Sequence, residues 1–345
     1  MTQPDYAGEG HLLATATLVA LVLVFAVIVA SAYLRLEQAG LGCADWPACY
    51  GSQLAVPADA ARQTVQEQSI VVVLVRFTHR MAAAGIGLLI MIIAIICIRA
   101  RRDWPAGVAI AVALVVLLLF LALLGRLTQG TRLPAVTLGN LIGGMSMLAL
   151  LWWLRLQCRG LGVVTSSRTD VRLAIWSWIC LCVLAMQIGL GALVSAVHAA
   201  ASCVNLADCH GILGSENWTY DAFNPWREVY APVDGAWQSD HARQALQMGH
   251  RIWGLATAAC LSVLARLLFL RGGACATLGL NLLGLLLLQI LLGVAAVVFQ
   301  PILLLVLLHN VTAAFMVLTV VSAIHHSRLA DVAEVSSACQ MMTSK

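Results

Sequence analysis

Eight long apolar stretches limit what this chain can fold into. A bilayer core about 30 Å thick needs roughly 20 apolar residues per spanning helix, and the sequence offers that length eight times. We therefore expect an all-α integral membrane fold with eight transmembrane helices. The predicted spans cover residues 12–34, 70–98, 106–124, 134–154, 173–196, 244–270, 275–299 and 302–324.

Composition excludes several classes of protein. Hydrophobic residues make up 61% of the chain and charged residues 10%, whereas a soluble domain carries roughly half apolar and a quarter charged residues. A soluble globular enzyme, a disordered chain and a nucleic-acid-binding protein are therefore excluded. The formal net charge of +4 is too small to indicate a polyanionic partner.

The placement of arginines predicts how the spans are oriented. Basic residues gather in the cytoplasmic loops of membrane proteins. Here they lie in the links 99–105 and 155–172, which share one side of the membrane if all eight stretches span it. We therefore expect a multi-pass protein of a bacterial-type inner (plasma) membrane, with both termini cytoplasmic. The long loops 35–69 and 197–243 are expected outside.

Two parts of the sequence resemble each other at an offset of 160 residues. Each carries two cysteines separated by five residues, and a His-Arg pair follows in the next apolar stretch, within FTHRMAAAG and MGHRIWGLA. Chance similarity is the alternative, but the equal spacings favour two pseudo-symmetric four-helix bundles, near residues 1–160 and 161–345. The aligned pairs are Cys43 with Cys203, Cys49 with Cys209, and His79 with His250.

Three histidines lie inside apolar stretches: His79, His250 and His309. Polar residues at membrane depth are expensive and usually mark function. At a rise of 1.5 Å per residue they lie about 9–14 Å deep, and all three stretches run from outside to inside. The imidazoles are therefore expected at similar depths in the outer leaflet. The outer-loop histidines His198, His210 and His241 are expected at the surface.

Two facing imidazoles in a helical bundle can hold a haem iron from both sides. His250 and His309 form such a pair in the C-terminal half, and the alternative is two packed histidines hydrogen-bonded across helices. Arg80 and Arg251 each follow a histidine. These arginines either meet haem propionates or extend toward the outer surface.

The N-terminal half departs from this pattern. The repeat places the partner of His79 within LPAVTLGNLIGG, where Asn140 stands. An amide is a poor iron ligand compared with imidazole. Either His79 binds haem alone and leaves the open position that substrate activation needs, or it binds no haem.

The paired cysteines, Cys43–Cys49 and Cys203–Cys209, face the oxidising side in this topology, where disulfides persist. Such a small loop closes without strain only if its turn brings the α-carbons within about 7 Å. We expect two structural disulfides. A redox-active pair beside a haem pocket and a zinc site built from all four cysteines are the alternatives.

These segments resemble the haem A synthase family, COX15/CtaA. AYLRLEQAGLGCADWPACYG is similar to its first outer-loop signature, and THRMAAAG, LPAVTLGNLIGG, MGHRIWG and LLHNVTA resemble segments around its haem ligands. The resemblance covers nearly the whole chain. It implies eight spans in two bundles, with haem b held between His250 and His309 in the second.

The resemblance also implies a reaction. Members of the family oxidise a ring methyl of haem O to a formyl group in the N-terminal half, and the product, haem A, serves terminal oxidases. The ligands there would be His79 and position 140. The family has a glutamate, a candidate catalytic acid/base, three residues before the first histidine. Arg76 stands there in this chain, one turn from His79; it stays protonated and cannot act as a base, but it can hold a propionate or developing negative charge.

The sequence thus predicts an oxidoreductase with haem b as cofactor, haem O as substrate and haem A as product. A haem b carrier or cytochrome oxidase assembly factor of the same fold is the rival, favoured by Arg76 and Asn140. A redox-linked transporter is favoured only by the helix count. Haem O synthase and cytochrome oxidase assembly factors are the expected protein partners.

Overall fold

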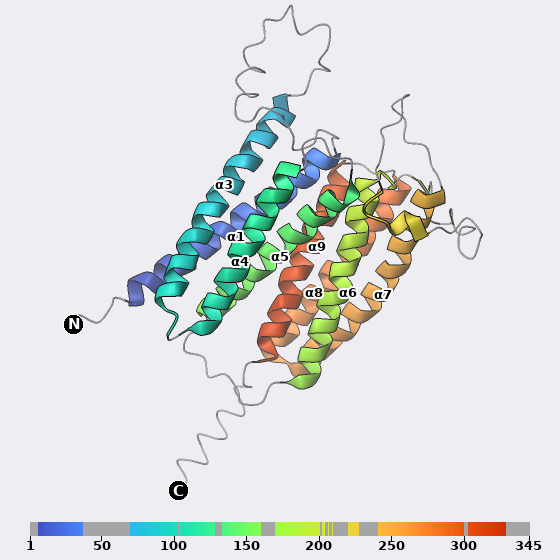
Figure 1. The fold of residues 1–345 in the computed structure, drawn as a ribbon. Coiled ribbons are helices and arrows are strands. Elements are labelled where there is room, and N and C mark those ends of the chain that lie inside the picture. Colours follow the sequence, from blue (N-terminus) through green and yellow to red (C-terminus); the bar gives the residue numbers. More distant parts are fainter. Residues whose placement is uncertain are drawn as a thin grey trace, which may run out of the picture.

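The computed structural model of the chain is a bundle of long, roughly parallel helices (Figure 1). Within the described residues it contains eight α-helices and one short 3-10 helix, and no strand. The described residues are 6–102, except 37–69; 104–127; 133–159; 170–227, except 201, 204, 205, 207, 208 and 210–219; 241–299; and 303–328. The elements are α1 (Tyr6–Leu36), α3 (Ile70–Arg99), α4 (Pro105–Leu127), α5 (Pro134–Arg159), α6 (Val171–Ala196), η2 (Tyr220–Phe223), α7 (His241–Arg271), α8 (Gly273–Val298) and α9 (Leu303–His326).

All eight α-helices are long and apolar enough to cross a membrane. The predicted all-α fold with eight spans is therefore confirmed. Large apolar side chains point away from the bundle, including Leu88, Leu119 and Leu255, as expected of helices whose outer surface faces lipid. Several helices run past the predicted limits, because helical hydrogen bonding continues beyond the apolar window; α1 begins at Tyr6 and α5 ends at Arg159.

Each set of four α-helices packs as a closed ring. In the first ring α1 contacts α3 and α5, and α4 contacts the same two helices. In the second ring α6 contacts α7 and α9, and α8 contacts those same two. The helices of the two rings contact one another in the same order along the chain. The symmetry that relates the two rings stays a prediction, as does the boundary near residue 160, which lies outside the described residues.

The two rings meet through their first and last helices. The α5 helix packs against α6 and α9, and α1 packs against α9. Arg35 Nε donates a hydrogen bond to Ser195 Oγ at 2.8 Å, between residues 160 positions apart. Because 160 is also the offset of the repeat, equivalent positions of the two halves meet at this interface.

The described chain begins and ends at the same end of the bundle (Figure 1). An even number of crossing helices requires this arrangement. The short connection between α3 and α4 also lies there, as does Gly272 between α7 and α8. Which end faces the cytoplasm stays a prediction.

Candidate functional site

His250 lies in α7, and its imidazole faces the amide of Gln187 from α6. The distance from Gln187 Nε2 is 3.3 Å to His250 Nδ1 and 3.4 Å to Nε2. The same amide nitrogen donates a hydrogen bond to the backbone carbonyl oxygen of His250 at 3.2 Å. One side chain of α6 therefore holds both the ring and the backbone of this histidine.

His309 lies in α9, and its imidazole also faces an amide, that of Gln289 from α8. Gln289 Nε2 lies 3.0 Å from His309 Nε2. The other ring nitrogen, Nδ1, is buried and has no hydrogen-bond partner in the described part of the chain. An imidazole with a buried, unpartnered nitrogen is a candidate ligand, because a lone pair in an apolar site gains much from any bond it can form.

Two glycines leave the space that these imidazoles occupy. A Cβ added at Gly191 in α6 would lie 3.1 Å from His250 Cε1, and one added at Gly293 in α8 would lie 3.3 Å from His309 Cε1. Carbon atoms pack best at about 3.5–4.0 Å, so a side chain at either position would press on the ring. The bare backbone of the neighbouring helix thus forms one wall of each histidine site.

Both histidines lie in the second ring, on helices α7 and α9. His309 and Arg251 both lie close enough to His250 to interact with it electrostatically. The α7 and α9 helices stand diagonally in their ring, since each contacts α6 and α8. The pair therefore approaches from opposite sides of the bundle core.

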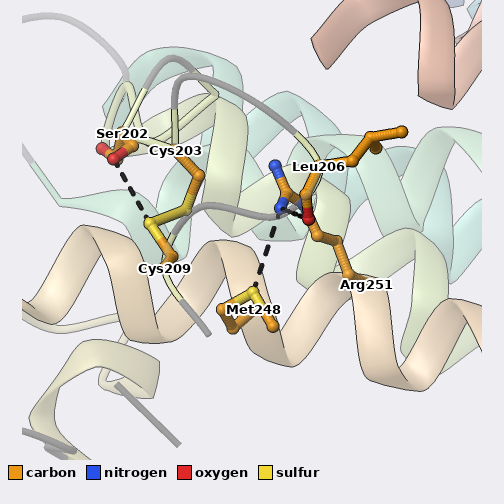
Figure 2. The surroundings of a disulfide bond; sticks show 6 residues. All are labelled: Ser202, Cys203, Leu206, Cys209, Met248 and Arg251. Carbon is orange, nitrogen blue, oxygen red and sulfur yellow. Dashed lines mark hydrogen bonds between the residues drawn. A yellow bond between two sulfur atoms is a disulfide. The ribbon is translucent and has the colours of Figure 1, made fainter. Parts of the chain in front are cut away.

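Arg251 points from α7 toward the loop segment that carries Leu206 (Figure 2). Its Nη1 lies 3.5 Å from the carbonyl oxygen of Leu206 and 3.9 Å from Met248 Sδ. Both predicted roles of Arg251, contact with a propionate and extension toward the outer surface, stay predictions.

The predicted disulfide between Cys203 and Cys209 is confirmed. The two α-carbons lie 5.7 Å apart, and the bond lies beside α7 at the level of Met248 (Figure 2). The disulfide closes the loop that carries Leu206, so it fixes the carbonyl that Arg251 contacts. Cys43 and Cys49 lie outside the described residues, and their pairing stays a prediction.

His198 is half-buried rather than at the surface, so the surface prediction does not hold for it. The chain turns back after α6, and Arg243 Nε from α7 donates to the Val197 carbonyl at 2.8 Å, which covers this turn. Burial and the Arg243 guanidinium lower the pKa of His198 below its usual range. His241 is exposed, as predicted, and His210 lies outside the described residues.

The short segment around η2 connects the second ring to the first. The ring of Phe223 in η2 packs against the α7 backbone beside His250, because a Cβ added at Gly249 would lie 2.8 Å from Phe223 Cε1. Two residues further on, the Pro225 carbonyl accepts a hydrogen bond from the Ala135 backbone N–H at 2.7 Å. The start of α5, the helix that carries Asn140, is therefore tied to the histidine site.

In the first ring, His79 is half-buried in α3, and its Nδ1 is buried without a hydrogen-bond partner among the described residues. Arg76 lies one turn earlier and is only 1% exposed, one of the largest fully buried side chains described. Asn140 is half-buried in α5. The α3 and α5 helices stand diagonally in the first ring, as α7 and α9 do in the second. Arg80 also lies in α3, and its role stays a prediction.

Sequence reasoning missed Gln187 and Gln289. A signal for them exists: the residues from Gln187 to Gly191 read QIGLG, and those from Gln289 to Gly293 read QILLG. This short repeat joins α6 to α8 within the second half. It differs from the repeat that relates the two halves, which is why the longer offset did not reveal it.

The fold and the site together define a multi-pass membrane protein whose helical bundle carries intramembrane histidines. The family described as "Cytochrome oxidase assembly protein", COX15-CtaA, matches residues 14–321. The heme A synthase of Shewanella oneidensis is 35% identical over 312 residues, which cover 88% of this chain and 93% of that protein. The chain belongs to the COX15/CtaA family.

Proposed function

We propose that this chain is a haem A synthase, an oxidoreductase of the plasma membrane that converts the ring methyl of haem O to the formyl group of haem A. The relative named heme A synthase matches across almost its entire length, which supports the activity. The observation that carries the proposal is the half-buried pair His250 and His309, each contacted by an amide from the neighbouring helix.

The second ring suits haem b as its cofactor. His250 and His309 offer imidazoles from diagonal helices, Gly191 and Gly293 leave room for their rings, and His309 Nδ1 is buried without a partner in the described chain. These residues fit a group that takes one nitrogen from each side. Bound there, haem b supplies one-electron redox chemistry. The protein holds both imidazoles, excludes water with apolar helices, and offers Arg251 for a propionate.

The first ring suits the substrate. Haem O is largely apolar, so a site between membrane helices can accept it from the lipid. His79 offers a buried ring nitrogen that no described residue engages. Arg76, fully buried one turn away, holds the negative charge of a propionate or of the reacting group. Asn140 stands where the repeat places a second ligand, and because its amide is a poor iron ligand, that position is left for substrate activation.

A second candidate function is haem b carriage during cytochrome oxidase assembly. Arg76 and Asn140 favour it, because neither side chain supplies the acid/base or ligand chemistry expected of the family at these positions. The description of the family as an assembly protein also agrees with it. Haem O synthase and oxidase assembly factors are the partners that either function would use.

Coexpression with a haem O synthase separates the two functions. The purified protein is extracted with acidified acetone, and its pigments are identified by chromatography and mass. Haem A in the extract supports the synthase; haem b with unreacted haem O supports the carrier. The variant His79→Ala serves as the matched test of the first ring: it loses haem A and keeps haem b.

A test of the two departures follows from the same extract. If haem A is absent, the double variant Arg76→Glu with Asn140→His is compared with the unmodified chain. Recovery of haem A then assigns the lost activity to these two positions. No recovery, with haem b intact, supports carriage as the function of the chain.

A further inference from the structure

In the second half, a glutamine followed four residues later by a glycine occurs twice, once beside each histidine. Gln187 and Gly191 lie four residues apart in α6, and so do Gln289 and Gly293 in α8. Residues four apart share one face of a helix. Each helix therefore presents an amide and a bare stretch of backbone to the same histidine.

At His250, α6 and α7 pack closely through glycines on both helices. Gly191 of α6 leaves room for the imidazole, and Gly254 of α7 leaves room for the amide, since a Cβ added at Gly254 would lie 3.2 Å from Gln187 Nε2. The amide also holds the His250 carbonyl at 3.2 Å. This fit restricts rotation of the ring and sliding of α7 along α6.

The carbonyl oxygens of both amides are available as hydrogen-bond acceptors. Gln187 Oε1 and Gln289 Oε1 are buried and have no hydrogen-bond partner within the described ranges. A half-turn of the terminal amide exchanges the positions of its nitrogen and oxygen. Each glutamine can therefore donate to an unprotonated ring nitrogen or accept from a protonated one.

A histidine that binds a metal needs the accepting form. When one ring nitrogen gives its lone pair to a metal, the other carries a proton, and an acceptor for that N–H orients the ring and raises its basicity. The glutamine carbonyl is such an acceptor. Because it is neutral, it orients the ring without the strong push of a carboxylate.

We propose that Gln187 and Gln289 are a pair of positioning residues that accept from His250 and His309, hold both imidazoles on the haem and set its reduction potential. This inference rests on the proposed function, since it requires haem b between the two histidines. It adds a role for two amides that lie behind the ligands.

The first half lacks these glutamine and glycine pairs. At the offset of 160, Val27 and Ser31 take the places of Gln187 and Gly191. When Asn140 is aligned on His309, Phe120 and Leu124 take the places of Gln289 and Gly293. These two apolar side chains pack on the residue before Asn140, because a Cβ added at Gly139 would lie 2.7 Å from Leu124 Cδ1 and 3.6 Å from Phe120 Cζ. Only in the second half, where we propose haem b, does a glutamine amide therefore fix the orientation of each imidazole.

The test measures haem b in the full-length, purified protein. The variants Gln187→Leu and Gln289→Leu remove the acceptor, and Gln187→Glu and Gln289→Glu strengthen it. Gln157→Leu is the matched control, since Gln157 is a half-buried glutamine near the far end of α5. The readouts are haem content, the reduction potential from a potentiometric titration, and carbon monoxide binding to the reduced protein.

We expect opposite shifts from the two kinds of variant. Loss of an acceptor weakens the imidazole as a ligand for the ferric state by about tenfold, which raises the potential by about 59 mV. The glutamate variants lower the potential, and a purely structural role would not reverse the sign. The leucine variants also bind carbon monoxide, because a loosened ring yields its position, whereas the unmodified protein and Gln157→Leu do not.

Two results separate the inference from the proposed function. Haem b with an unchanged potential and no carbon monoxide binding in all four variants would overturn the positioning role and leave the haem site standing. If a leucine variant loses its haem, the glutamate variant at the same position decides: retained haem at a lower potential supports the role. An unmodified protein that holds no haem b would overturn the proposed function itself.

Discussion

The close approach of Gly191 to His250 allows a quantitative prediction. In Gly191→Ala the new methyl group would lie 3.1 Å from His250 Cε1, about 0.4–0.9 Å inside a comfortable carbon contact. Overpacking of this kind costs about 1–3 kcal/mol. Without haem the ring can turn away from the methyl group, whereas a ring that binds the iron must return to its place, so this cost falls on haem binding. We expect the affinity for haem b to fall roughly 5- to 150-fold.

A neighbouring glycine supplies the control. A Cβ added at Gly189, two residues earlier in α6, would meet Leu138 Cδ1 at 3.5 Å, which is ordinary contact. Gly189→Ala should therefore keep its haem, and it gains up to about 1 kcal/mol from helix propensity. Haem affinity is measured by titrating haem into the protein after its pigment is removed. Equal affinities in Gly191→Ala and Gly189→Ala would refute the close packing of α6 on this imidazole.

The remaining predictions concern the outer loop and the first ring. Burial and Arg243 lower the pKa of His198, so the unfolded state takes up a proton first and stability is lost as the pH falls below about 6.5. The variant His198→Asn removes this titration, and asparagine tolerates the positive φ of 55° at this position. Its melting temperature should therefore fall less between pH 7 and pH 5 than that of the unmodified protein. Cys203→Ser should lower the free energy of unfolding by about 2 kcal/mol in a denaturant titration, and no loss would mean that the disulfide does not constrain the unfolded chain. Arg76→Leu should weaken binding of haem O more than binding of a propionate ester of haem O, in a spectroscopic titration; equal losses would remove the charge argument.

The membrane fold could be predicted because span length is a local property. An apolar run of the right length marks a helix whatever it packs against, and all eight runs became helices. The helix ends could not be predicted as well. Tyr6 begins α1 and Arg159 ends α5, and both lie outside the apolar runs by which the spans were recognised.

The histidines of the site stood out for the same local reason, as polar residues within apolar runs. Gln187 and Gln289 share that property, yet their role depends on which helix faces which, and only packing reveals it. The surface prediction for His198 failed for a related reason, since Arg243, which donates to the neighbouring Val197 carbonyl, comes from a helix that begins more than 40 residues later. Contacts between segments that are distant in the sequence cannot be recognised from local residue patterns.

Electron paramagnetic resonance of the oxidised, purified protein tests whether His250 and His309 hold one haem between them. We expect a low-spin ferric signal typical of two axial imidazoles, lost in His250→Ala and in His309→Ala. A high-spin signal in the unmodified protein, or a low-spin signal that survives both substitutions, would contradict it.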